Sequence, residues 1–123
     1  MPLSKAEEQL MKHLWDLEPC YMKDLLAALP EPKPAKTTIA TLLKRMLDKE
    51  VIGFQLHQNR RRYFARVSKQ AYFGKQLRGT ISRFFNGSPT AFASLLTDEA
   101  DLTREQLESL QRMINERLKD TPK

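Results

Sequence analysis

The sequence predicts a mainly α-helical protein that contains one small β-hairpin. Three amphipathic segments precede two short runs rich in β-branched and aromatic residues, and three further amphipathic segments follow them. The distribution of charge adds a third observation. The chain of 123 residues has a net charge of +6, and residues 33–66 hold nine lysines and arginines against two acidic residues. Such focusing of positive charge favours a polyanionic partner.

Two helices are expected before residue 30. Ser4 and Glu7 have the spacing of a capping box, and apolar side chains at intervals of three and four continue this helix over about residues 4–17. A shorter amphipathic stretch follows at residues 22–29. The PEPKPA segment, residues 30–35, then rules out a continuous helix, because its prolines break helical hydrogen bonding and stiffen the connection.

The third helix has the clearest periodicity in the chain and is expected at residues 36–49. Its apolar positions follow the i, i+3, i+4, i+7, i+8 pattern and are Ile39, Leu42, Leu43, Met46 and Leu47. The opposite face carries short hydroxyls and then cations, namely Thr37, Thr38, Thr41, Lys44 and Arg45. An ordinary solvated helix mixes both signs of charge, whereas this face has no carboxylate before Asp48. The face is therefore a candidate binding surface.

A β-hairpin is expected directly after the third helix. Residues 51–57 and 60–67 are rich in strand-forming side chains, and Gln58 and Asn59 suit the turn between them. Three helices followed by a hairpin are the elements of a winged helix-turn-helix, so the fold class is an N-terminal winged helix-turn-helix followed by a three-helix C-terminal dimerisation region. The second strand opens with Arg60, Arg61 and Arg62.

The three arginines of the wing are not expected to be equivalent. Successive residues of a strand face opposite sides, so Arg60 and Arg62 share one face with Arg61 opposite, unless an irregular tip splays all three. Tyr63 is expected to pack rather than to contact bases. Phosphate attraction is the role that this run of charge suggests, which would leave sequence selection to the threonines of the third helix.

Three further helices are expected in the rest of the chain. Ser68 and Thr103 are the expected caps of the first and the last, and Pro89 fits the first turn of the middle one. Residues 1–67 thus form a winged-helix DNA-binding domain, and residues 68–123 form a helical dimerisation domain.

The apolar stripes of residues 68–123 need a partner, because so few residues cannot make a substantial core alone. A second copy of the chain is the economical partner, so a homodimer is expected. The residues assigned to dimerisation are Phe73, Leu77, Ile81, Phe84, Phe85, Phe92, Leu95, Leu96, Leu107, Leu110 and Ile114.

Double-stranded DNA is the polyanion that fits the third helix best. A helix enters the major groove, and residues near the N-terminus of a recognition helix come closest to the base edges. Short threonines let the backbone approach, while the longer cations reach phosphate or guanine. The residues assigned to DNA binding are Lys36, Thr37, Thr38, Thr41, Lys44 and Arg45 in the helix, with Arg60, Arg61 and Arg62 in the wing.

The sequence offers no enzymatic or metal site. It contains no glycine-rich phosphate loop, no G-x-S-x-G and no H-E-x-x-H motif. Cys20 and His13 lack a third catalytic group, and two scattered histidines with one cysteine make a poor metal site. No catalytic residue, metal or cofactor is therefore expected. The single cysteine, the lack of a signal peptide and the lack of a long apolar run predict a cytoplasmic protein without membrane insertion.

With these residues assigned, the chain resembles the penicillinase-repressor (BlaI/MecI) family of bacterial winged-helix repressors from Leu3 to Glu116. The resemblance rests on LSKAEEQLMKHLW, TTIATLLKRMLDKEVI, RRRYF, FFNGS and DLTREQLESLQRMI, in this order. It implies a homodimeric transcriptional repressor that binds a dyad-symmetric operator through residues 36–49 and the basic wing. It also implies that a membrane-embedded sensor protease acts upstream and releases repression through cleavage of the repressor.

The chain departs from the family's pattern in three places. The best-known members are cut at an Asn-Phe bond before the last helix, and Leu95 and Leu96 align there, so they mark the candidate cleavage region without its usual bond. Glu50 stands where a glycine is common after the recognition helix. Copper-sensing relatives carry clustered C-terminal cysteines, and this chain has none there.

Two other functions remain open at this point. A winged-helix adaptor would use the same cations to bind an acidic protein. A non-specific architectural protein would bind DNA without sequence preference. Salt dependence and sequence preference of binding separate the three possibilities.

Overall fold

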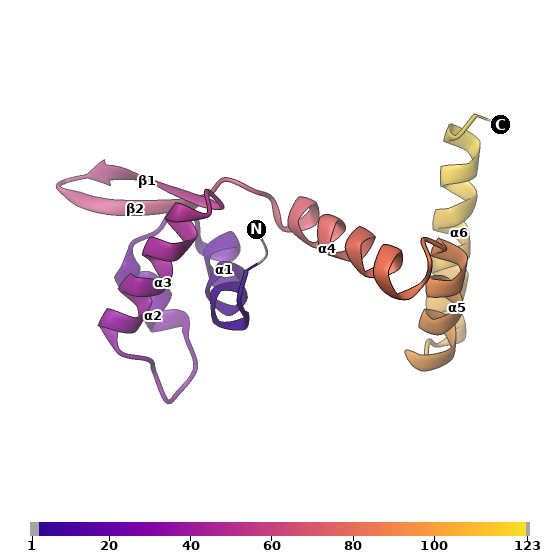
Figure 1. The fold of residues 1–123 in the computed structure, drawn as a ribbon, viewed down its shortest axis with the longest axis horizontal. Helices are drawn as coiled ribbons and strands as arrows, with labels where there is room; N and C mark the ends of the chain where they lie inside the picture. Colours follow the sequence, from indigo (N-terminus) through magenta and orange to yellow (C-terminus); the bar gives the residue numbers. More distant parts are fainter. Residues whose placement is uncertain (1–2, 123) are drawn as a thin grey trace. The chain divides into compact units, whose positions relative to one another are not determined.

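The structure, a computed structural model, describes residues 3–122. Its six helices and two strands follow the predicted order (Figure 1). They are α1 (Lys5–Leu17), α2 (Met22–Ala28), α3 (Lys36–Asp48), β1 (Ile52–His57), β2 (Arg60–Ala65), α4 (Lys69–Phe84), α5 (Pro89–Glu99) and α6 (Arg104–Asp120). The mainly α-helical fold with one antiparallel hairpin is thereby confirmed.

The chain divides into two compact units, Met1–Gln76 and Leu77–Lys123. The sequence placed the boundary earlier, between residues 67 and 68. The first two turns of α4 belong to the first unit because they pack on α1. The Trp15 indole donates to the Val67 carbonyl at 2.9 Å, and its ring lies 5.8 Å from that of Phe73.

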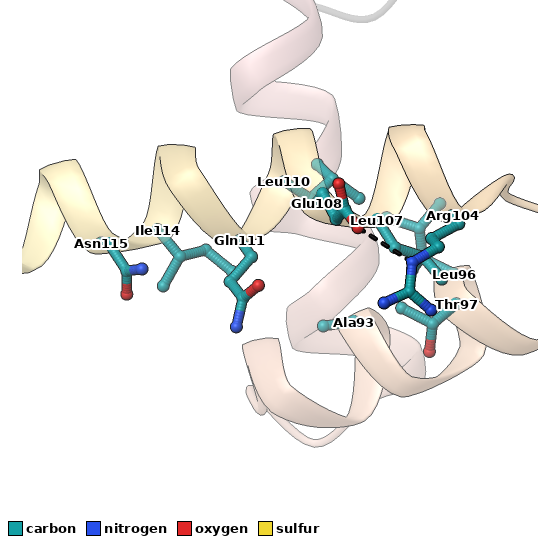
Figure 2. A pocket seen from close by; sticks show the side chains of 10 residues that line it. All are labelled: Ala93, Leu96, Thr97, Arg104, Leu107, Glu108, Leu110, Gln111, Ile114 and Asn115. Carbon is teal, nitrogen blue, oxygen red and sulfur yellow. Dashed lines mark hydrogen bonds and ion pairs between the residues drawn. The ribbon is translucent and has the colours of Figure 1, made fainter.

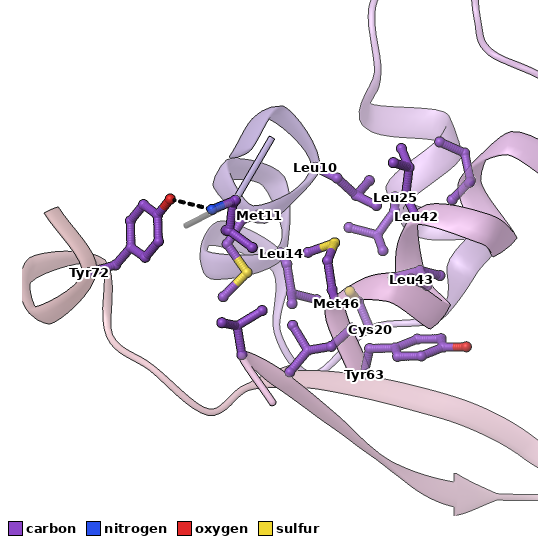
Figure 3. Close-up of a cluster of buried hydrophobic side chains, with 14 residues drawn as sticks. Leu10, Met11, Leu14, Cys20, Leu25, Leu42, Leu43, Met46, Tyr63 and Tyr72 are labelled. Carbon is purple, nitrogen blue, oxygen red and sulfur yellow. Dashed lines mark hydrogen bonds between the residues drawn. The ribbon is translucent and has the colours of Figure 1, made fainter. Parts of the chain in front are cut away.

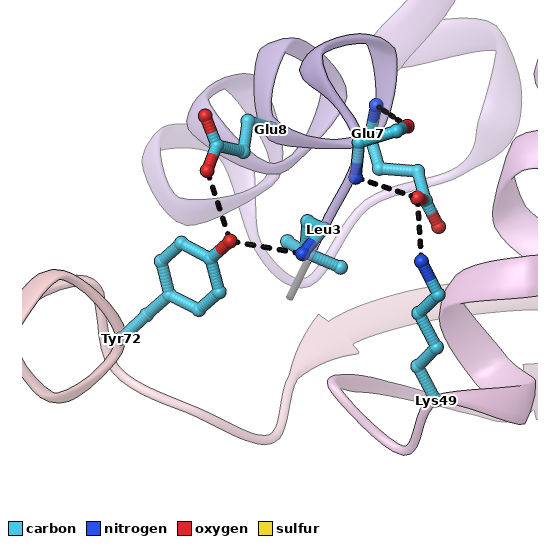
Figure 4. Close-up of polar contacts among 6 residues, drawn as sticks. Leu3, Glu7, Glu8, Lys49 and Tyr72 are labelled. Atoms are coloured by element: carbon cyan, nitrogen blue, oxygen red, sulfur yellow. Dashed lines mark hydrogen bonds and ion pairs between the residues drawn. The ribbon is translucent and has the colours of Figure 1, made fainter. Parts of the chain in front are cut away.

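Tyr72 anchors the start of α4 more firmly still. Its hydroxyl accepts a hydrogen bond from the Leu3 amide at 3.0 Å and donates one to the Glu8 carboxylate at 2.9 Å (Figure 4). A buried phenol needs partners for its hydroxyl, and here both come from the N-terminal part of the chain. Phe73, which the sequence groups with the dimerisation residues, consequently contacts Trp15 and Tyr72 within the first unit.

The core of the first unit is built from the predicted apolar stripes (Figure 3). Helices α1, α2 and α3 each bury one face against the others, and the β1–β2 hairpin covers the remaining side of the core. The most deeply buried apolar side chains are Leu10, Met11, Leu14, Leu25, Ile39, Leu43, Met46 and Ile52. Full burial of one such side chain is worth roughly 1.5–3 kcal/mol, so these contacts are the main support of the unit.

The hairpin has a regular two-residue turn. His57 pairs with Arg60, and the turn residues Gln58 and Asn59 have φ values of 52° and 64°. Positive φ at both central positions is the mark of a type I′ turn, whose twist matches that of the strands. Cys20 lies along the other side of β2, where it forms an isolated antiparallel bridge with Tyr63.

The second unit consists of the end of α4 with α5 and α6. The described residues from Leu77 onward include no buried side chain. The helix ends are nevertheless well formed. Ser88 caps α5, and Thr103 with Gln106 makes the predicted capping box of α6. Local signals therefore define these helices, while their apolar faces stay open.

Candidate nucleic-acid interface

The polar face of α3 is exposed along its whole length. Its predicted members Lys36, Thr37, Thr38, Thr41, Lys44 and Arg45 are all exposed, whereas Ile39, Leu42, Leu43 and Met46 are buried. The Thr41 hydroxyl donates to the Thr37 carbonyl at 3.0 Å. With its proton engaged inside the helix, the Thr41 oxygen is left to accept hydrogen bonds from outside.

The N-terminal end of α3 lacks a side-chain cap. Ala35 occupies the cap position, and its methyl group cannot accept a hydrogen bond from the first turn. Unsatisfied amides and the helix dipole make such an end favourable for an anion. Lys36 adds a cation at the same end.

Lys33, a cation of the basic window, binds within the fold. Its ammonium donates to the carbonyls of Leu26, Ala27 and Leu29 at 2.8–3.0 Å. These carbonyls lie at the C-terminal end of α2, where a cation stabilises the unpaired groups and the helix dipole. Part of the charge between residues 33 and 66 thus serves the fold.

The C-terminal end of α3 is fixed by a buried ion pair. The Lys49 ammonium lies 2.7 Å from the Glu7 carboxylate, and Glu7 is only 1% exposed (Figure 4). Burial alone would raise the pKa of Glu7, but hydrogen bonds from Lys49 and Ser4 and the charge of Lys49 outweigh it. The pKa of Glu7 is therefore lowered from its ordinary value. Glu7, which completes the capping box of α1, thus also holds the C-terminal end of α3.

The wing arginines alternate between two sides of the hairpin, as expected for a regular strand rather than for an irregular tip. The guanidinium of Arg60 lies 4.1 Å from the ring centroid of Tyr21, and that of Arg62 lies 6.0 Å from the same ring. Arg61 instead lies 4.1 Å from the ring centroid of Phe54. Tyr63 packs in the core at 6% exposure.

Sequence reasoning did not foresee Tyr21 as part of this surface. The Cys20–Tyr63 bridge sets the residue before α2 alongside β2, and Lys23 lies near the same ring at 6.0 Å. Pairing between residues so distant in sequence leaves no periodic signal. Neither Tyr21 nor Lys23 falls in the basic window that drew attention to the site.

Four of the predicted dimerisation residues line an apolar groove between α5 and α6 (Figure 2). The groove has a volume of about 560 Å³, and Leu96, Leu107, Leu110 and Ile114 are among its lining residues. Other large apolar side chains lie exposed on the same unit, namely Leu77, Phe84, Leu95, Met113 and Leu118. Phe85 and Phe92 instead pack edge-to-face at 5.6 Å.

Residues 3–122 contain no cluster of three or more His, Cys, Asp or Glu side chains that could hold a metal ion. None of the helices described is both long and apolar enough to span a bilayer. Cys20 is buried, and burial first, then the charges of Asp24 and Glu18, raise the pKa of its thiol to about 11, which opposes reactivity.

The chain is similar to a known protein family. The family model described as "Penicillinase repressor" matches residues 3–116, which is almost the whole chain. The comparison with curated proteins gave no match.

Proposed function

Since the chain belongs to the penicillinase repressor family, whose members repress transcription, we propose that it is a cytoplasmic homodimer that binds a dyad-symmetric operator. The observation that carries the proposal is the face of α3, where hydroxyls and cations are exposed without a carboxylate before Asp48. In this reading α3 enters the major groove and the wing follows the neighbouring backbone.

Thr37, Thr38 and Thr41 supply the sequence selection in this proposal. Their short side chains let the backbone of α3 approach the base edges, and their methyl groups suit the methyl of thymine. The oxygen of Thr41, whose proton is engaged by Thr37, would accept from the amino groups of adenine or cytosine. Lys44, Arg45 and the wing arginines then supply phosphate contacts that fix the register.

In this proposal the second unit supplies the surface through which two copies associate. Exposed leucine, isoleucine and methionine side chains along α5 and α6 are the kind of surface that a homodimer interface covers. Two linked recognition helices would reach half-sites about one helical turn, or a small multiple of it, apart. Because the second half-site then binds intramolecularly, the dimer gains affinity through effective concentration.

Selection of bound genomic fragments tests the proposal directly. An enriched palindrome supports a repressor of defined genes. Affinity without any enriched sequence would support an architectural DNA-binding protein instead, and failure to bind DNA would favour an adaptor. A salt series gives the number of phosphates neutralised, because the log–log slope is about −0.9 for each.

Thr41→Glu tests the assignment of the reading face. A carboxylate placed against the groove should weaken operator binding by about a hundredfold or more, since like charges held together cost several kcal/mol. Thr90→Glu, the same change at an exposed position of α5, should leave binding unchanged. Light scattering should show that both variants stay dimeric. Equal operator affinities for the two variants would contradict the assignment.

Release by proteolysis is proposed at Leu95 and Leu96. Both lie inside α5, so a protease acting in an upstream sensor pathway must first unwind a helical turn. Cleavage there would separate α6 from the DNA-binding unit and would leave two monomers of low affinity. Mass spectrometry of the chain from induced cells tests this route. A fragment ending at Leu95 supports it, and derepression with an intact chain contradicts it.

A further inference from the structure

A small cationic pocket lies where the start of α2, the start of α3 and the wing meet. Its volume is about 310 Å³. Its lining residues come from segments far apart in the sequence and are Tyr21, Met22, Lys23, Lys36, Arg60, Arg61 and Tyr63. Of these, Tyr21, Met22, Lys23 and Tyr63 lie outside the surface that the sequence assigned to DNA.

The ring of Tyr21 organises the cations of the pocket. Hydrogen bonds of 3.0 and 2.6 Å between the backbones of Cys20 and Tyr63 fix this segment beside β2. The Arg60 guanidinium then lies 4.1 Å from the ring centroid, well within the range of a cation–π contact, and Lys23 lies at 6.0 Å. An arginine ordered in this way loses less conformational entropy when it binds an anion.

The positive charge of the pocket is not neutralised by carboxylates. Within residues 3–122, no salt bridge involves Lys23, Lys36 or the wing arginines. The nearby carboxylate of Asp24 accepts a hydrogen bond from the Tyr21 amide and so serves the start of α2. Like charges gathered round one hollow repel each other, and an anion placed among them removes that repulsion.

We propose that this pocket binds one backbone phosphate of the operator, with Tyr21 positioning Arg60 and with Lys23 as a direct contact. The inference rests on the proposed function and adds a site to it. A phosphodiester fits better than a free nucleotide, because three cations already lie 4.1–6.0 Å from the centroid of the half-buried Tyr21 ring and compete there with a stacking base. The pocket also joins the two elements, α3 and the wing, between which a DNA strand would run.

A salt series with Lys23→Ala gives the first test. Loss of one phosphate contact should reduce the log–log slope of operator binding by about one and weaken binding to all sequences alike. Lys12→Ala, which removes an exposed cation of α1 outside the pocket, should leave the slope unchanged. If the wild-type protein binds its operator and the two variants behave alike, the pocket is not a phosphate site, although the repressor proposal stands. If the wild-type protein binds no DNA, both proposals fall.

Tyr21→Phe and Tyr21→Ala separate the ring from its hydroxyl. Phenylalanine keeps a ring for Arg60 and should keep operator affinity, whereas alanine should lower affinity about tenfold at an unchanged melting temperature. If Tyr21→Phe lost as much operator affinity as Tyr21→Ala, the positioning role of the ring would be overturned.

A neutral methylphosphonate placed at each operator position in turn identifies the phosphate. At one position per half-site, the substitution should weaken operator binding by the wild-type protein and should have no further effect on binding by the Lys23→Ala variant. Additive effects at every position would overturn the direct contact. Titration with inorganic phosphate distinguishes a free anion as the ligand: saturable binding that Lys23→Ala abolishes, without any such position in the DNA, would assign the pocket to a free anion and reject the operator.

Discussion

The two units of the chain use similar helices in opposite ways. In the first unit, α1 and α3 bury their apolar stripes, and every buried hydrophobic side chain of residues 3–122 lies between Leu3 and Tyr72. In the second, α6 is as clearly amphipathic and as well capped, yet Leu107, Met113, Ile114 and Leu118 are 42–65% exposed. Periodicity therefore predicts a helix but not what covers it. The first unit contains its own core, whereas the apolar side chains of the second unit stay exposed.

Leu110→Asp should have the largest effect of the changes considered for this comparison. Leu110 lines the groove of the second unit, and in a symmetric dimer the new carboxylate enters the interface twice. Each unpaired buried charge costs about 3 kcal/mol or more, so the dimer dissociation constant should rise by about 10⁴-fold. Sedimentation equilibrium measures this change.

Ser109→Asp is the matched control for that experiment. It adds the same charge to α6 at an exposed position that does not line the groove. It should remain dimeric, and the melting of the first unit should be unchanged in both variants. A dimer that survives Leu110→Asp would show that the two copies meet through another surface.

Leu14→Ala and Leu118→Ala apply one chemical change to both units. Leu14 is 0% exposed, so its truncation should lower the free energy of unfolding by about 3 kcal/mol through lost burial and a cavity. Leu118 is 65% exposed, so in the monomeric Leu110→Asp background its truncation should cost less than about 0.5 kcal/mol. Urea denaturation of both variants measures the difference, and equal costs would show that the second unit has a core of its own.

The sequence predicts local structure well because its signals are local. The capping boxes at Ser4 and Thr103 and the turn at Gln58 and Asn59 appear where the residue types place them. It also predicts which side of α3 is exposed, since periodicity sets the buried face. The assignments of individual residues to DNA and to the dimer interface stay predictions.

What the sequence does not predict depends on contacts between distant residues. The start of α4 joins the first unit because Tyr72 and Phe73 pack on α1. Lys33 is counted in the basic window of residues 33–66, although its ammonium binds the end of α2. Tyr21 lies beside the wing because the Cys20–Tyr63 bridge holds its segment there. None of these contacts follows from composition or periodicity, because each forms only when folding brings distant segments together.

Glu7→Gln should have a smaller effect, confined to the first unit. The variant keeps an oxygen for the capping box but removes the charge that pairs with the partly exposed Lys49. The expected cost is about 2 kcal/mol at neutral pH, the usual contribution of a hydrogen bond to a charged group. Since the pKa of Glu7 is lowered below its ordinary 4.5, its stabilisation is fully present above that pH and is lost as pH falls through the folded-state pKa.

The pH dependence distinguishes this ion pair from a surface charge. The difference in stability between the wild type and Glu7→Gln should shrink on acidification below about pH 4.5. Asp16→Asn, which neutralises an exposed carboxylate of the same helix, should show little difference at any pH. A difference for Glu7→Gln that stays constant from neutral to acid pH would show that shape, not charge, accounts for the loss.

Glu50→Gly should have the smallest effect, and the only stabilising one. Glu50 has a φ of 62° at the junction of α3 and β1, where the Val51 amide donates to the Met46 carbonyl at 3.2 Å. A side chain with a Cβ is strained there, whereas glycine is not, and the greater freedom of glycine in the unfolded chain offsets part of the gain. The net expectation is about 0.5–1 kcal/mol of added stability in urea denaturation. Asn59→Gly, at a φ of 64°, should change stability less, because asparagine tolerates this conformation. If Glu50→Gly instead destabilised the unit, the Glu50 side chain would have to make a contact that outweighs its backbone strain.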